Sequence, residues 1–91
     1  MAEGTATVRN SAGIHVRPSG VILKAFADYP GKITLAAKGR EVELPNLVGL
    51  IALGLQENDT VSISVDGPDD ESTCAAVVRL IEKRFDFPQK G

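Results

Sequence analysis

Apolar and polar residues alternate along four short stretches of the chain, at residues 5–8, 32–35, 40–44 and 60–65. In the third stretch, for example, Val42 and Leu44 share one side while charged residues occupy the other. Alternation of this kind is typical of β-strands that have one buried face. Lys38-Gly39 is a candidate hairpin turn between the second and third stretches. The pattern therefore predicts four strands, each with one wet and one buried side.

A helical period replaces the alternation in three other segments, at residues 16–29, 47–53 and 70–85. The first segment places Ser19, Ile22, Leu23, Phe26 and Tyr29 on one face, and the third places Cys74, Val77, Val78, Ile81 and Phe85 on one face. Asn46 is a suitable N-cap for the short middle helix, and Gly54 suits its left-handed end. Pro30-Gly31 is expected to end the first helix.

The predicted order of elements is β-α-β-β-α-β-α. Because every strand alternates, one face of the sheet should be buried and the other exposed to water, which favours an antiparallel arrangement. Three amphipathic helices then have a single apolar face to cover. The expected fold class is α+β, an open-faced two-layer sandwich with a four-stranded antiparallel sheet covered on one face by three helices.

Composition narrows the possible functions. With 91 residues, 43% of them hydrophobic and 24% charged, the chain predicts a single folded domain over residues 1–91. A net charge of −2 argues against a dedicated nucleic-acid binder. We expect no membrane span, because no apolar run reaches the necessary length. One cysteine, Cys74, excludes an internal disulfide, and with a single histidine the chain offers too few soft ligands for a metal site. With no export signal visible, we expect a cytoplasmic protein.

The most informative segment is Gly13-Ile14-His15-Val16-Arg17-Pro18. His15 is the only histidine, and it falls where a turn meets the start of a predicted helix. The first N–H groups of a helix and its macrodipole attract anions, and Arg17 adds a planar cation suited to phosphate oxygens. An imidazole in such a place can accept and release a phosphoryl group. The alternative from spacing alone is a surface histidine that caps the helix weakly.

The stretch Asn10-x-x-Gly13-Ile14-His15-Val16-Arg17-Pro18 resembles the active-site motif of the HPr family, the histidine phosphocarriers of the bacterial sugar phosphotransferase system. The second signature of that family is similar to residues 44–55 of this chain, which read Leu-Pro-Asn-Leu-Val-Gly-Leu-Ile-Ala-Leu-Gly-Leu. The predicted order of elements also matches the HPr fold. The resemblance covers about residues 3–85.

The resemblance implies a function. Similar proteins accept a phosphoryl group on the histidine Nδ1 from phosphorylated enzyme I, with phosphoenolpyruvate as the ultimate donor, and pass it to an enzyme IIA protein or domain in sugar uptake. His15 corresponds to the phosphorylation site and Arg17 to its phosphate-stabilising neighbour. The expected role is a relay rather than a stand-alone enzyme, with no cofactor of its own. The alternative is a regulatory, nitrogen-type or truncated-system paralogue with the same phosphohistidine chemistry and no sugar transport.

The short helix is also expected to dock partners. Leu50 and Leu53 share its core-facing side, which leaves Leu47, Val48 and Ile51 without an obvious internal partner. The alternative is that these three belong to the core or are scattered surface residues. The resemblance assigns partner contacts to the neighbouring first helix as well, at Val16, Gly20 and Lys24. Lys24 is equally compatible with an ordinary solvated surface lysine.

One position departs from the family pattern. Many Gram-positive HPr proteins carry a regulatory serine at the start of the short helix, where this chain has Asn46, which lacks a hydroxyl. A binding protein that uses this fold without phosphorylation should lack His15 or Arg17, and both are present. An RNA-binding sandwich should carry exposed aromatics and a basic face, whereas here no aromatic residue lies on a predicted strand and the net charge is negative. The expected partners are therefore enzyme I and enzyme IIA, with no nucleic acid, for a monomeric protein.

Overall fold

A computed structural model describes residues 1–10 and 16–83, with the backbone alone described at residues 16–18. In these residues the order of elements is β1 (Ala2–Thr7), α1 (Val16–Phe26), β2 (Lys32–Ala37), β3 (Arg40–Leu44), α2 (Leu47–Ala52), β4 (Thr60–Asp66) and α3 (Asp70–Ile81). This is the predicted β-α-β-β-α-β-α order. The predicted α+β class is confirmed.

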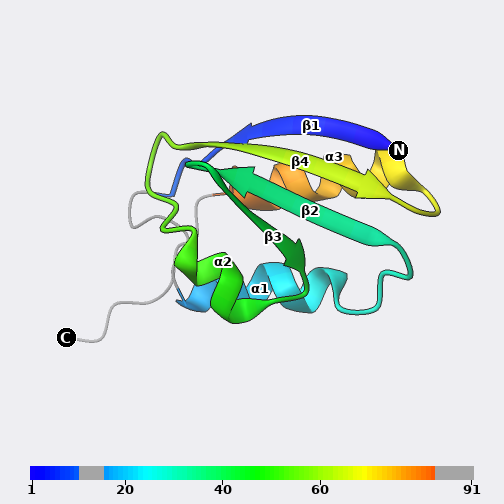
Figure 1. The fold of residues 1–91 in the computed structure, drawn as a ribbon, viewed down its shortest axis with the longest axis horizontal. Coiled ribbons are helices and arrows are strands. Elements are labelled where there is room, and N and C mark those ends of the chain that lie inside the picture. Colours follow the sequence, from blue (N-terminus) through cyan, green and yellow to red (C-terminus); the bar gives the residue numbers. More distant parts are fainter. Residues whose placement is uncertain (11–15, 84–91) are drawn as a thin grey trace.

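The strands form one antiparallel sheet in the order β1-β4-β2-β3 (Figure 1). Ile33 of β2 lies opposite Val65 of β4 and Leu44 of β3, so apolar residues meet in rows across the strands. Burial alternates along β2 and β4, as predicted. α3 packs against β1 and β4, α2 against β3, and α1 against both other helices. The helices thus cover the apolar face of the sheet.

The core lies between the sheet and the helices. Its largest fully buried members come from every layer of the fold: Ile22, Ile33, Leu35, Leu50, Ile63 and Ile81. Burying an aliphatic side chain of this size stabilises a fold by about 1.5–3 kcal/mol relative to leaving it exposed. The predicted inward positions Leu50 and Leu53 are 0% and 4% exposed. Leu23, Tyr29 and Val78 are only partly buried, at the edge of the core.

Both long helices end earlier than the periodicity predicted. α1 ends at Phe26 instead of residue 29, where the N–H of Tyr29 donates to the carbonyl oxygen of Phe26 at 3.2 Å in a turn directly before Pro30. The Tyr29 hydroxyl donates to the carbonyl oxygen of Pro68 at 2.8 Å. α3 ends at Ile81 instead of residue 85. There the carboxylate of Glu82 accepts a hydrogen bond from the backbone N–H of Thr7 at 2.9 Å. The expected inward position of Phe85 lies outside the described residues.

The short middle helix follows the prediction closely. Asn46 is its N-cap, with an extended backbone and a side chain that accepts from the N–H of Gly49. The helix ends at Ala52, one residue before the predicted end, and Gly54 then adopts the left-handed conformation with φ of +63°. The predicted hairpin turn between β2 and β3 is present, with φ of +54° at Lys38 and +75° at Gly39.

Candidate functional site

The predicted nucleophile directly precedes α1. His15 lies outside the described residues, and so do the turn residues 11–14. The residue after it, Val16, is the first of the eleven-residue helix α1. The side chain of Arg17 is likewise not described, so its predicted contact with a phosphoryl group stays a prediction. In this region the structure describes the backbone of α1 from Val16 onward.

The N-terminal end of α1 favours a bound anion. Its first turn carries no acidic side chain, so no carboxylate competes for the N–H groups at this end. Those N–H groups have no partner within the helix, and the macrodipole places partial positive charge there. Pro18 contributes no N–H, but its ring suits the first turn. This end of α1 can therefore stabilise a negative charge by about 0.3–1 kcal/mol, and more where it is partly buried.

The chain on either side of the undescribed turn is anchored. Before the turn, the N–H of Val8 donates to the carbonyl oxygen of Asp59 at 2.9 Å, and the N–H of Asn58 donates to the carbonyl oxygen of Val8 at 2.8 Å. Asn10 is 4% exposed. After the turn, Ser19 is fully buried, and its hydroxyl has no hydrogen-bond partner among the described residues. The chain is therefore fixed on both sides of residues 11–15, which lie outside the described residues.

A cluster of exposed apolar side chains lies on α2. Leu47, Val48 and Ile51 are 41%, 77% and 36% exposed, although their neighbour Leu50 is fully buried. These three residues are called the α2 patch below. Exposure of large apolar side chains in a group is typical of an interaction surface. The prediction that they point away from the core is therefore confirmed, whereas their contact with partners stays a prediction.

α1 lies beside α2 and extends this surface (Figure 1). Gly20 and Lys24 are exposed on α1, as the predicted docking role requires. A Cβ added at Gly20 would meet no atom within 4 Å, so the backbone is bare at this point. Val21, 37% exposed, is a further apolar residue that sequence reasoning did not assign to the site. Its position on the solvent side of the helical period was the available signal.

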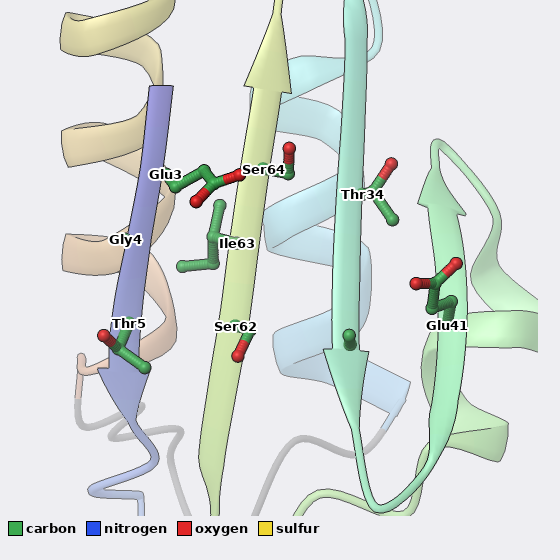
Figure 2. Close-up of a pocket in the computed structure, with 9 residues that line it drawn as sticks. Glu3, Gly4, Thr5, Thr34, Glu41, Ser62, Ile63 and Ser64 are labelled. Atoms are coloured by element: carbon green, nitrogen blue, oxygen red, sulfur yellow. The ribbon is translucent and has the colours of Figure 1, made fainter. Parts of the chain in front are cut away.

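The opposite face of the sheet is uncovered and forms a shallow hollow of about 690 Å³. Figure 2 shows Glu3 and Glu41 on the two outer strands, with Thr34, Ser62 and Ser64 between them. The hollow contains none of the predicted site residues. It lies across the sheet from the helices, so it is separate from the candidate site.

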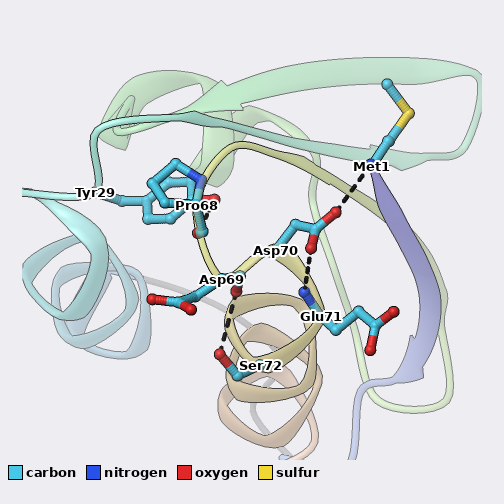
Figure 3. Close-up of polar contacts among 7 residues, drawn as sticks. All are labelled: Met1, Tyr29, Pro68, Asp69, Asp70, Glu71 and Ser72. Atoms are coloured by element: carbon cyan, nitrogen blue, oxygen red, sulfur yellow. Dashed lines mark hydrogen bonds and ion pairs between the residues drawn. The ribbon is translucent and has the colours of Figure 1, made fainter.

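The other polar clusters are also distant from the candidate site. At the start of α3, the Met1 ammonium lies 2.9 Å from Asp70 Oδ2, and Asp70 Oδ1 accepts from the N–H of Glu71 (Figure 3). The hydrogen bond with the ammonium lowers the pKa of Asp70, and the same bond raises the pKa of the ammonium. Tyr29 also reaches this loop, through the carbonyl of Pro68. These contacts join β1, α3 and the end of α1 and offer no nucleophile.

Cys74 does not provide a second nucleophile. It is 5% exposed, and burial raises the pKa of its thiol. A thiol with a raised pKa is a poor nucleophile at neutral pH. No group of three potential metal ligands occurs in the described part of the chain. Among the same residues, no helix is long and apolar enough to cross a membrane.

Comparison with known sequences points to one family. The PTS-HPr family model, described as "PTS HPr component phosphorylation site", matches residues 2–83. The phosphocarrier protein HPr of Mycoplasma genitalium is 30% identical over 84 residues, which cover 91% of this chain and 96% of the relative. The phosphocarrier protein HPr of Xylella fastidiosa (strain Temecula1) is 29% identical over 85 residues, which cover 93% of this chain and 96% of the relative.

Solved structures agree. The crystal structure of an HPr from Thermoanaerobacter tengcongensis superposes with a TM-score of 0.81 at 27% identity, covering 89% of this chain and 91% of that one. A phosphocarrier protein HPr from Bacillus anthracis has a TM-score of 0.83 at 17% identity, covering 89% and 96%, and at that identity it supports the fold alone. The open-faced sandwich predicted from the sequence is therefore the fold of these proteins.

Proposed function

Since the chain belongs to the HPr family of the phosphotransferase system, we propose that it accepts a phosphoryl group on His15 from phosphorylated enzyme I and passes it to an enzyme IIA protein or domain. In the first step, the lone pair of the imidazole Nδ1 attacks phosphorus. The bond from phosphorus to the donor breaks, and its electron pair stays with the donor. The second step is the same exchange, with phospho-His15 as the donor. The chain is a carrier, and nothing is oxidised or reduced.

One observation carries this proposal. The only histidine of the chain stands immediately before a helix whose first turn has no acidic side chain. The positive end of α1 suits the charge of a phosphoryl group, and the Arg17 guanidinium has the planar geometry that phosphate oxygens accept. Because transfer of a phosphoryl group needs mainly positioning and charge stabilisation, these groups are sufficient for a relay.

The α2 patch is proposed to receive the partners. The neighbouring helix α1 exposes Gly20, Val21 and Lys24, which we propose to form one surface with the α2 patch, with Lys24 as a cationic residue at its rim. Apolar centres of this kind provide binding energy, and a cation at the rim steers acidic partners toward the surface. Val16 begins α1, next to the reacting residue, and is proposed to contact the same partners.

The test is incubation with a cognate enzyme I and phosphoenolpyruvate, followed by intact mass. The protein should gain one phosphoryl group, which mild acid removes because a phosphoramidate bond is acid-labile. His15→Ala should gain none and keep its far-ultraviolet circular dichroism. Ser62→Ala, which removes an exposed hydroxyl on the open face of the sheet, should be labelled like the wild type. Full labelling of His15→Ala would overturn the proposal.

We further propose that this carrier lacks control by a serine kinase at the start of α2. Asn46 occupies that position and caps the helix through its carboxamide oxygen, which offers no hydroxyl for phosphorylation. Incubation of the wild type with ATP and an HPr kinase should leave its mass unchanged. Phosphate on any serine or threonine in that assay would show that such control survives at another site.

A further inference from the structure

The C-terminal end of α2 is held by two cations that come from the β2–β3 hairpin. α2 has six residues and no basic side chain in its own last turn. Arg40 Nη1 donates to the carbonyl oxygen of Ala52 at 3.3 Å, and Lys38 Nζ donates to the carbonyl oxygen of Gly54. A helix this short is not stable alone, so its position depends on the packing of Leu50 and on the contacts at its ends.

Lys38 is itself held in place. Its Nζ lies 2.9 Å from Asp59 Oδ2, and the same carboxylate oxygen accepts from the backbone N–H of Gln56 at 2.7 Å. The ammonium therefore joins three points: the hairpin turn, Gly54, which is the second residue after α2, and the residue before β4. These contacts fix the segment of chain between the end of α2 and the start of β4.

The backbone conformation at Lys38 disfavours this residue, which indicates a role for its ammonium group. Lys38 has φ of +54°, in the left-handed region that disfavours residues other than glycine. A two-residue hairpin turn of this kind favours Asn-Gly or Gly-Gly. The pair with Asp59 does not compensate by much, since its side chains are 42% and 28% exposed and exposed ion pairs contribute little. The position therefore sacrifices local stability while it fixes the end of α2.

We propose that Lys38 is a positioning residue for phosphotransfer. It holds the C-terminal end of α2 and so sets the direction in which the α2 patch meets a partner. This inference rests on the proposed function, because it assigns Lys38 a role in the docking of enzyme I and enzyme IIA. The contacts of Lys38 in the described part of the chain are with Gly54 and Asp59, so it should affect recognition of the partner protein rather than the transfer step.

The test variant is Lys38→Asn, because Asn-Gly suits the turn and should leave the melting temperature unchanged or raised. We expect the KM for transfer from enzyme I to rise about threefold to tenfold, the weight of one hydrogen bond, with kcat nearly unchanged. Amide hydrogen exchange should become faster in α2 and at Gly54, but not in β2. Lys38→Arg should restore the KM in part.

Two controls separate positioning from charge. Lys32→Met removes an exposed cation that lies 3.9 Å from Glu43, and its KM should match the wild type. Asp59→Asn frees the Lys38 ammonium while making the protein less acidic and keeping an oxygen for Gln56. If Lys38 acts by position, this variant raises the KM; if it acts by attracting acidic partners, the KM stays equal or falls, and the inference is overturned.

The inference and the proposed function fail in different ways. A wild type that takes no phosphoryl group from enzyme I overturns the proposed function, and the role of Lys38 in transfer with it. A wild type that is phosphorylated normally, beside a Lys38→Asn variant with unchanged KM or unchanged exchange in α2, overturns the role of Lys38 alone.

Discussion

The Oδ1 atom of Asn46 lies 2.9 Å from the backbone nitrogen of Gly49 and accepts the hydrogen bond that caps α2. The two residues also limit one another sterically. A Cβ added at Gly49 would lie 2.9 Å from Asn46 Nδ2 and would collide with the side chain of Val42. The start of α2 therefore depends on the capping side chain of Asn46 and on the absence of a side chain at Gly49, three residues later.

Asn46→Asp tests the charge at this end of α2. A carboxylate still accepts from Gly49, and the helix dipole favours it by a few tenths of a kcal/mol, so the melting temperature should hold or rise. The added charge lies beside the α2 patch, where a partner must desolvate it, so transfer from enzyme I should slow. Asn46→Ala is the matched control. It should lose about 1 kcal/mol of stability because the cap is absent.

Gly20 of α1 and Gly49 of α2 should respond to alanine in opposite directions. Gly20→Ala adds a methyl group where no atom lies within 4 Å, and it should raise the free energy of unfolding by about 0.5–1 kcal/mol. Gly49→Ala should lower that free energy by about 1–3 kcal/mol, because Val42 and Asn46 must move. Chemical denaturation measures both.

The transfer rate of Gly20→Ala adds a functional result. If a partner approaches the bare backbone at Gly20, the stabilised variant should transfer more slowly. A rate equal to that of the wild type would show that Gly20 is merely tolerated, and would remove it from the docking surface.

Val48 and Val77 separate docking from packing. Val48 is 77% exposed and Val77 is fully buried. Val48→Asp should change the free energy of unfolding by about 0.5 kcal/mol or less and slow phosphotransfer, because a charge enters the apolar centre of the surface. Val77→Ala should cost about 2 kcal/mol, from two lost methyl groups and the cavity they leave, with a normal transfer rate for the folded fraction. A loss of several kcal/mol in Val48→Asp would place that side chain in the core.

Sequence reasoning succeeded where the signal was local. β3 has the predicted bounds because its alternation is strict and Lys38-Gly39 marks the turn before it. The N-cap of α2 was correct because a carboxamide three residues before Gly49 can satisfy a free N–H. The exposed side of α2 was also visible, because Leu50 and Leu53 already account for its core-facing side.

The rest depends on contacts between distant segments. α3 ends at Ile81, and the next residue, Glu82, accepts a hydrogen bond from the backbone N–H of Thr7, which is 75 residues away in sequence. The hydrogen bond from Lys38 to the carbonyl oxygen of Gly54 joins residues that are 16 apart in sequence, and only the folded hairpin brings these two residues together. No periodicity or propensity encodes either contact. His15 and Arg17 were identified as candidate site residues from the sequence. The exposure of Val21 and the contacts that hold the end of α2 were identified from the structure.

The acid side of the pH profile should report on the Lys38–Asp59 pair. The hydrogen bond from Lys38 lowers the pKa of Asp59, and the N–H of Gln56 adds to the effect. Because the folded pKa lies below the unfolded one, the pair contributes its stability above the unfolded value of about 3.9. That contribution is lost as the pH falls through the folded pKa.

A carboxyl-carbon NMR titration should therefore give Asp59 a midpoint below that of an exposed carboxylate. In Lys38→Asn the midpoint should move upward. The protection factor of the Gly54 amide, which corrects exchange for the intrinsic effect of pH, should no longer change between pH 5 and the acid limit. A midpoint for Asp59 that is identical in the two proteins would show that the ammonium does not hold the carboxylate in solution.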